Sequence, residues 1–323
     1  MTRGAMIVMV CLAAYALLDL AVSVFVAILW RTRAVAPSNL PPAVRARRVL
    51  LLRMTPFAVS LGITLLIVAP AFTLFEPVHD YEPYGPALAV LALAAFSRLA
   101  GSAIWAIFSI HLTNRIEREW LESSLPLDTS YGLRAFMIDT AAPIVALVGV
   151  FRPTLIASRN VIDACSAEEI AAIMAHERGH FDASDNVKRW LIAWLPDMLR
   201  WSRVHYEMLD SWHHAAEDGA DDAATGGDEV ARADLAALLL KVVRLAPPLS
   251  WRGAVVSPFV ERDGIEHRVR RLIKPALEPP APLAIVPMIA VATIVTAMIA
   301  TLSSPSTLRA IFVAFENLVA LGR

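Results

Sequence analysis

Ala175-His176-Glu177-Arg178-Gly179-His180 carries the motif HExxH within a segment that is predicted to be helical. Residues four positions apart share one face of an α-helix, so His176 and His180 can direct their imidazoles at one metal ion. Glu177 then lies beside the position where the metal would bind water. The spacing therefore predicts a Zn²⁺ site with two histidine ligands and a general base, as in a zinc hydrolase.

The residues before the motif support a helix at this place. Ser166 and Glu169 have the spacing of a capping box, and Ile170, Ile173 and Met174 form an apolar stripe after it. Because HExxH alone is short enough to occur by chance, the rest of the ligand set has to be found elsewhere in the chain.

A third ligand is expected, because catalytic zinc usually takes three protein groups and leaves one position open. Metzincins supply it in HExxHxxGxxH, but Ala183 and Asn186 occupy those positions here and exclude that class. A second predicted helix, His213 to Thr225, carries Glu217 and Asp221 on one face. Glu217 can complete the metal site, and Asp221 can accept the second ring N–H of a ligating histidine.

Motifs spread over roughly the middle half of the chain resemble those of membrane gluzincins, in the family's order. The closest likeness is to bacterial sensor-transducer metallopeptidases of the beta-lactam-regulator type. The matching stretches are Asp139-Thr140-Ala141-Ala142-Pro143, Val150-Phe151-Arg152-Pro153 leading into Ile156-Ala157-Ser158, Ser166-Ala167-Glu168-Glu169, His176 to His180, Asp185-Asn186 and Glu217 to Asp221.

The resemblance implies a role for each matching residue. It makes His176, His180 and Glu217 zinc ligands. It makes Glu177 the catalytic base and Asp221 an acid that supports a ligand. Arg268, in Arg268-Val269-Arg270-Arg271-Leu272, matches a supporting arginine. We expect a family member without the extracellular sensor domain, so drug sensing is not implied.

The composition is that of a membrane protein, with 57% hydrophobic and 18% charged residues. The net charge of −1 says nothing about partners, and no basic stripe suggests a nucleic-acid partner. Four stretches reach the about 20 apolar residues that a bilayer span requires. They are Ala5 to Trp30, Met54 to Phe75, Gly85 to Ile110 and Leu283 to Leu302.

We therefore expect an α+β, mostly helical membrane protein of four transmembrane helices with an inserted gluzincin domain. Residues 1–111 would hold three spans, residues 112–280 the zinc metalloprotease domain, and residues 281–323 the fourth span with an amphipathic C-terminal helix. Pro56 and Pro70 in the second span, and Pro287 in the fourth, should bend or fray these helices near their ends. The apolar segment Trp190 to Pro196 either dips into the membrane interface or forms a Trp-rich core helix.

Basic residues predict the orientation. The first loop carries Arg31, Arg33, Arg45, Arg47 and Arg48, whereas the second, Glu76 to Tyr84, has no Lys or Arg. By the positive-inside rule we expect the first loop and the catalytic region to be cytoplasmic. The family resemblance implies that the membrane is the cytoplasmic membrane of a bacterium.

Three predicted strands precede the zinc helix: Leu133 to Ile138, Ile144 to Val150 and Thr154 to Ser158. Gluzincins generally pair an edge strand with an extended substrate, and the resemblance places that strand near Ala146 to Gly149. An internal strand is the alternative, because periodicity does not separate the two.

Further histidines are candidates for the site. His213 lies on the face of Glu217 and either approaches the metal or a substrate, or is a surface or supporting histidine. His205, with Tyr206, and His267 are candidate donors to the oxyanion of the reaction. Spacing alone does not choose among them.

Two charges lie near the middle of predicted spans, Asp19 in the first and Arg98 in the third. A lone charge at that depth costs at least about 2.5–3.5 kcal/mol, and such residues usually face a partner. We therefore predict that Asp19 and Arg98 pair, with Ser97 and Gly101 allowing close helix approach. The alternative is that each snorkels or meets water separately.

The expected function is that of a membrane-bound zinc metalloendopeptidase acting on a cytoplasmic or membrane-face polypeptide. By resemblance the substrate is a transcriptional repressor or another copy of the protease, through self-cleavage or in a homodimer. One alternative is a housekeeping quality-control gluzincin of the membrane. Another is a non-proteolytic scaffold or transporter with a structural zinc site, which the small number of intramembrane polar residues argues against.

Overall fold

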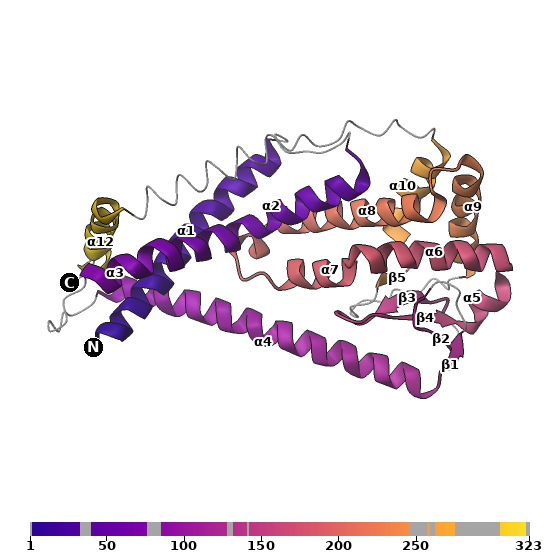
Figure 1. Cartoon of the computed structure of the whole chain (residues 1–323), viewed down its shortest axis with the longest axis horizontal. Coiled ribbons are helices and arrows are strands. Elements are labelled where there is room, and N and C mark those ends of the chain that lie inside the picture. Colours follow the sequence, from indigo (N-terminus) through magenta and orange to yellow (C-terminus); the bar gives the residue numbers. More distant parts are fainter. Residues whose placement is uncertain are drawn as a thin grey trace.

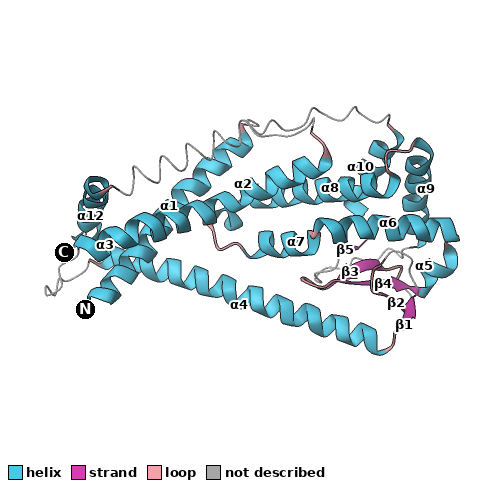
Figure 2. Cartoon of the chain, in the orientation of Figure 1, coloured by secondary structure: helices cyan, strands magenta, loops and turns pink. Residues whose placement is uncertain are grey.

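The computed structural model of the chain describes residues 2–32, 40–75, 85–127, 132–140, 142–245, 257–258, 262–274 and 304–320. Within these ranges the chain is mostly helical, with one small sheet (Figure 2). Long helices gather at one end of the molecule, and the sheet lies at the other (Figure 1). The described part of the chain thus has the expected mixture of many helices and few strands.

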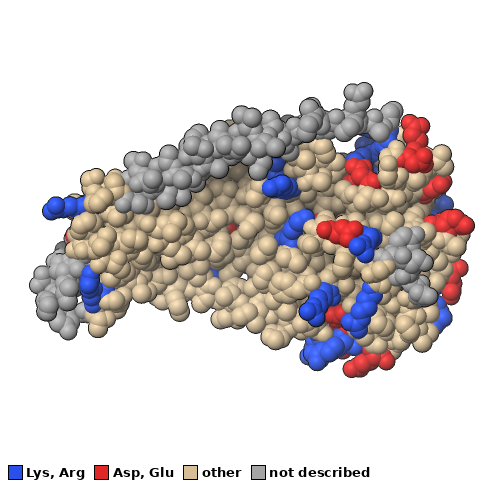
Figure 3. Space-filling view, viewed as in Figure 1, with Lys and Arg blue, Asp and Glu red and all other residues tan. Residues whose placement is uncertain are grey.

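Three helical segments are long and apolar enough to cross a membrane. They are α1 (Arg3–Arg31), the segment Pro42–Phe75 and α4 (Pro86–Glu122). Large apolar side chains such as Phe25, Leu65 and Phe96 are exposed on them. On the face drawn in Figure 3, most charged residues lie over the end that contains the sheet. The fourth expected span, Leu283 to Leu302, lies outside the described residues.

Pro70 accounts for an irregular turn in the second segment. There α2 (Pro42–Ile63) continues through a π-helical turn, Thr64–Val68, into α3 (Ala69–Phe75). Proline has no N–H with which to bond the carbonyl group one turn earlier. The N–H of Ala69 instead bonds to the carbonyl oxygen of Thr64, five residues back, so the helix accommodates Pro70 by one widened turn.

The sheet has five strands, β1 (Leu125–Leu127), β2 (Ala135–Ile138), β3 (Val145–Val148), β4 (Thr154–Ser158) and β5 (Ser257–Pro258). Their order is β1-β2-β4-β3-β5, with β2 and β4 parallel and the other pairs antiparallel. The three strands predicted from the sequence are confirmed, the first two with somewhat shorter bounds and the third, Thr154 to Ser158, with the same bounds. β1 and β5 escape prediction because two or three residues are too few to show an alternating pattern.

The predicted edge strand needs a correction. On the outer side of β3, Ala146 pairs with Pro258 and Leu147 with Ser257. Farther along, the side-chain amide of Asn186 donates to the carbonyl oxygens of Leu147 (3.0 Å) and Gly149 (2.7 Å). The expectation of a free edge over Ala146 to Gly149 is therefore wrong, and β3 is internal where β5 pairs with it. An open edge leaves backbone groups unpaired, and here distant residues satisfy them.

Helices cover one face of the sheet, and α4 reaches the other. Leu147 is buried in one core with Ile173 of α6 (Ala167–Ala183) and Leu239 of α9 (Glu229–Leu245). Ile156 is buried on the opposite face, near Trp120 of α4. The remaining elements are α5 (Arg159–Ala164), α7 (Asp185–Trp194), a 3₁₀ turn at Met198–Trp201, α8 (Arg203–Thr225), α10 (Arg262–Ile273) and α12 (Pro305–Ala320).

α8 connects the two ends of the molecule. Its Met208 and Trp212 are buried together with Val26 of α1 and Val49 of α2. In Figure 1, α2 and α8 run side by side, and α6 lies beneath α8. One helix therefore packs on the apolar bundle along one face and on the HExxH helix along another.

α7 packs against α4, one of the three helical segments that are apolar enough to cross a membrane. Trp190 Nε1 donates to the carbonyl oxygen of Ala106 (3.2 Å) and lies 3.1 Å from Ser109 Oγ. Trp194 stacks on Trp105 with ring centroids 6.3 Å apart. The Trp-rich segment is thus helical to Trp194 and lies on α4, at the end of the bundle that faces the sheet.

The expected C-terminal helix is present as α12. Its Leu308 is buried with Ile67 and Ala71, and the ring of Phe312 lies 5.0 Å from that of Phe72. The apolar stripe of α12 therefore packs on the second membrane segment.

A buried polar cluster ties the connection between α7 and α8 to the bundle. Asp19 Oδ2 lies 3.0 Å from Arg98 Nη2 and accepts a hydrogen bond from Met198 N at 3.0 Å. Arg53 forms an ion pair with Asp197, and both side chains are buried. Two ion pairs from three membrane helices thus hold the turn at Asp197–Met198.

We expect Asp19→Arg alone, or Arg98→Asp alone, to destabilise the folded protein by about 3–5 kcal/mol, because each leaves a buried charge without its partner. The double swap should recover much of that loss. Thermal unfolding of the purified proteins in one detergent measures all three.

The exposed pair Arg115–Glu119 on α4 serves as the control. Reversing it should change stability by no more than about 1 kcal/mol. A double swap of Asp19 and Arg98 that is as unstable as the worse single variant would contradict a direct pair.

Candidate metal centre

The start of α6 is fixed by the predicted capping box. The Ser166 hydroxyl accepts from Glu169 N (3.3 Å), and the Glu169 carboxylate accepts from Ser166 N (2.7 Å). The helix ends at Ser184, which has a left-handed conformation with φ 55°. This local structure presents His176 and His180 one turn apart on one well-defined helix, with Glu177 next to His176.

Gly179 allows α6 to approach α8 closely. A Cβ atom at this position would lie 3.1 Å from the Cα atom of Ala220 and 3.2 Å from the Cβ atom of Ala223. Neither contact can relax by moving a flexible side chain. The small residues at the crossing therefore set the distance between the helix that carries the histidines and the helix that carries Glu217.

His176, His180 and Glu217 converge at this crossing, with one potential ligand atom from each within 4.8 Å of the others. Glu217 Oε1 lies 3.4 Å from His180 Nε2, and Glu217 Oε2 lies 3.6 Å from His176 Nε2. Ligands about 2.0–2.2 Å from a tetrahedral zinc ion lie about 3.3–3.6 Å from each other. Each histidine therefore lies at about this spacing from one oxygen of the Glu217 carboxylate.

Both histidines are held by a carboxylate on the far side of the ring. His176 Nδ1 lies 3.0 Å from Asp221 Oδ1, and His180 Nδ1 lies 2.9 Å from Asp185 Oδ2. A carboxylate at Nδ1 fixes the tautomer that leaves Nε2 free as a ligand. Both Nε2 atoms face the same carboxylate of Glu217.

Arg268 joins α10 to the site. Its Nε and Nη2 atoms bind the two oxygens of Asp221 at 3.0 and 2.6 Å, and Nη1 lies 3.0 Å from Glu217 Oε2. A bidentate contact of this kind fixes the orientation of the carboxylate. Arg268 thus fixes the acid that holds His176 and also touches the candidate third ligand.

Burial and neighbouring charges shift the pKa values of the three carboxylates of the site in different directions. Burial raises the pKa of Glu177, although His180 and His176 oppose the shift. Burial also disfavours the charged form of Asp221, but Arg268 and His176 outweigh it and lower the pKa to about 2. Glu217 has its pKa lowered despite burial, by His180, His176 and Arg268. Glu177 is therefore the carboxylate best suited to take up a proton.

The residues fit a bound zinc ion and its water. Glu177 Oε2 and His180 Nε2 are buried, and neither has a hydrogen-bond partner in the described part of the chain. Such atoms are costly unless something else binds them. Two histidines and a carboxylate are a known catalytic ligand set for Zn²⁺, and a carboxylate next to the open position suits water.

The other candidate histidines are placed differently. His213 is partly buried one turn before Glu217, and its Nε2 has no hydrogen-bond partner among the described residues. Its removal from solvent lowers its pKa to about 3. His205 accepts a hydrogen bond from Arg53 Nε at 3.1 Å. It precedes Glu217 by twelve residues, about 18 Å along a helix, which is too far to reach the reacting atoms. Tyr206, next to it, is exposed.

His267 contacts Asp218 and is not part of the cluster of potential metal ligands. Its Nε2 lies 3.2 Å from Asp218 Oδ2, and its side chain is 46% exposed. The sequence analysis named it only as one of several candidate oxyanion donors. Adjacent residues on a helix point about 100° apart, so Arg268 faces Asp221 while His267 faces Asp218.

Sequence reasoning missed the roles of Asp185 and Asp218. Asp185 stood in a matching motif, but nothing in its spacing showed that it holds His180. Asp218, next to Glu217, forms ion pairs with Arg45 and Arg271. The contacts of Asp218 join residues 53 and 173 positions apart, and that of Asp185 depends on the turn after α6, so no local pattern could have revealed them.

Residues 115–250 match the sequence profile of Peptidase family M48. No curated protein matches the chain. The profile covers both the HExxH helix and α8, and it supports a metallopeptidase of that family. Together with the three apolar helices, it points to a membrane-associated metallopeptidase.

We expect Glu217→Ala to lose zinc, because two histidines alone leave the ion short of a ligand. Asp221→Ala should keep the ligand set but weaken zinc binding by about 10- to 100-fold. Zinc content after dialysis against a graded series of chelator concentrations measures both effects.

Asp210→Ala on the same helix is the control, since Asp210 is exposed and lies outside the cluster. It should bind zinc like the unaltered protein. Tightly held stoichiometric zinc in Glu217→Ala would exclude Glu217 as the third ligand.

Proposed function

We propose that this chain is a membrane-bound zinc metalloendopeptidase that cleaves a polypeptide at the cytoplasmic face of a bacterial membrane. The observation that carries the proposal is the convergence of His176, His180 and Glu217 beside the buried carboxylate of Glu177. The match to Peptidase family M48 supports the reaction class.

In this proposal the residues of the chain have separate tasks. His176, His180 and Glu217 would hold zinc, which when bound lowers the pKa of water and polarises the carbonyl group of the scissile bond. Glu177 takes the proton from the attacking water and later delivers it to the leaving amine. Asp221, Asp185 and Arg268 keep the ligands oriented and take no part in the proton transfers.

We further propose that the membrane spans and the protease form separate regions: residues 1–111, 112–280 and 281–323. α4 is one unbroken helix to Glu122, so the first boundary lies within a helix that runs on to β1. The arginine-rich first loop favours a cytoplasmic protease region. The contact of Arg45 with Asp218 is consistent with that loop and α8 lying on the same side.

The likeness to sensor-transducer peptidases supports a narrower version, in which the substrate is a regulator or a second copy of this chain. Housekeeping quality control is the alternative. Comparing the proteomes of cells with the unaltered protein and with a Glu177 variant distinguishes the two functions. A regulatory protease should change the cleavage of one substrate, whereas a quality-control protease should change the cleavage of many.

The mechanism predicts that Glu177→Gln removes proteolysis, by about 100-fold or more, while zinc stays bound. The neutral amide keeps the size of the side chain but cannot accept the proton. Cleavage of a casein substrate and zinc content are measured on the same preparation. Asp182→Asn, an exposed change on the same helix, should keep full activity. Undiminished cleavage by Glu177→Gln would rule out the role of Glu177.

The orientation predicts that alkaline phosphatase fused after Asp163 is inactive, because the enzyme requires export to fold. A fusion within the loop Glu76 to Tyr84 should be active in the same cells. The opposite pair of results would place the protease region outside the cytoplasm.

A further inference from the structure

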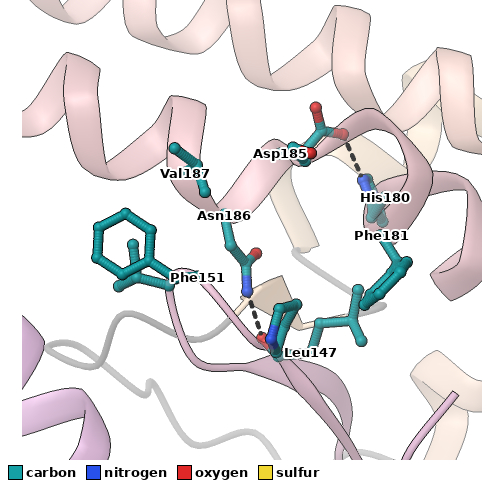
Figure 4. A pocket seen from close by; sticks show the side chains of 10 residues that line it. Leu147, Phe151, His180, Phe181, Asp185, Asn186 and Val187 are labelled. Carbon is teal, nitrogen blue, oxygen red and sulfur yellow. Dashed lines mark hydrogen bonds and ion pairs between the residues drawn. The ribbon is translucent and has the colours of Figure 1, made fainter.

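A pocket of about 120 Å³ lies beside His180. It is bounded by the junction of α6 and α7 on one side and by the end of β3 and the turn after it on the other (Figure 4). Most of its wall is apolar, formed by Leu147, Val150, Phe151, Phe181 and Val187.

Two polar side chains of the wall, Asp185 and Asn186, are already engaged, and a third, Ser184, is exposed. Asp185 contacts His180 Nδ1 at 2.9 Å and Lys188 Nζ at 3.3 Å. The amide nitrogen of Asn186 donates to two carbonyl oxygens of the β3 end, as Figure 4 shows for Leu147. A polar side chain entering this pocket would lose its hydrogen bonds to water and find few new partners. The burial of an apolar side chain would instead be favourable.

The location of the pocket relates it to the reaction. His180 is both a wall of the pocket and a proposed zinc ligand, and a ligating nitrogen lies about 2.0–2.1 Å from the ion. An extended peptide advances about 3.3–3.6 Å per residue. A side chain in contact with the His180 ring therefore belongs to a residue within two positions of the cleaved bond.

The volume limits what the pocket can hold. A protein cavity of about 150 Å³ is known to accommodate benzene. A pocket of about 120 Å³ is thus large enough for a branched aliphatic side chain and too small for an indole ring. Phe151 narrows the mouth: it is 62% exposed, and its ring packs edge-on against Trp190 with centroids 5.8 Å apart.

We infer that this pocket is the subsite that selects the substrate, by taking one aliphatic side chain such as Leu, Ile or Val within two residues of the cleaved bond. The inference rests on the proposed protease function. Leu147, Phe181 and Val187 supply the contact surface, and Phe151 sets the upper size limit.

The test uses the full-length protein in detergent with a peptide library that varies one position at a time on both sides of the cleaved bond. At one position, kcat/KM should be about 10- to 100-fold higher for Leu than for Asp or Gly. Val187→Phe should fill the pocket, lower kcat/KM for the Leu peptides by about tenfold or more, and spare the Gly peptides. Phe151→Ala should shift the preference toward Phe and Trp.

Val230→Phe is the matched control, because Val230 is exposed on α9 far from the site. It should keep the preference of the unaltered protein. Zinc content and cleavage of the Gly peptides show that each variant is folded. Absence of an aliphatic preference, or a preference that Val187→Phe leaves unchanged in a zinc-loaded active protein, would overturn the subsite. If the unaltered protein cleaves nothing that Glu177→Gln does not, the proposed function fails and the subsite with it.

Discussion

The close approach of α6 to α8 at Gly179 is the constraint on which the site depends. The two histidines come from one helix and Glu217 from the other, so the separation of the helices sets the distance between the potential ligand atoms. A side chain at Gly179 would meet Ala220 and Ala223 at 3.1–3.2 Å, and any outward shift of α8 would lengthen the contacts of Glu217 with both histidines. Dense packing transmits such a shift because there is little free volume to absorb it.

Around this crossing, the carboxylates that hold the histidines are buried and paired. Asp221 is held by Arg268 and His176, and Asp185 by His180. An isolated buried charge costs several kcal/mol, whereas a paired and hydrogen-bonded one is tolerated. The same rule holds in the bundle, where Asp19 faces Arg98. The ion pairs Asp19–Arg98 and Arg53–Asp197 hold the connection before α8, and α8 carries Glu217. α8 therefore links the apolar helices to the candidate metal centre.

The parts of the structure that local sequence could predict are those held together by neighbours in the chain. The capping box at Ser166 and Glu169, the HExxH face of α6 and the three longer strands follow from spacing within a few residues. The strand pair formed by β5, by contrast, depends on residues more than 100 positions away. The expected free edge of β3 was wrong for that reason: pairing partners far along the chain leave no periodic signal at the strand they cover.

The sequence by itself determined the chemistry available to this protein: an HExxH helix, a second helix with Glu217 and Asp221 on one face, and apolar stretches long enough for a membrane. Only the tertiary structure decided which groups meet. It paired His180 with Asp185, turned Arg268 toward Asp221 and His267 toward Asp218, and placed His205 against Arg53 instead of near the site. Helical periodicity fixes the face on which a side chain lies, but its partner depends on how that face packs, and packing is a property of the whole chain.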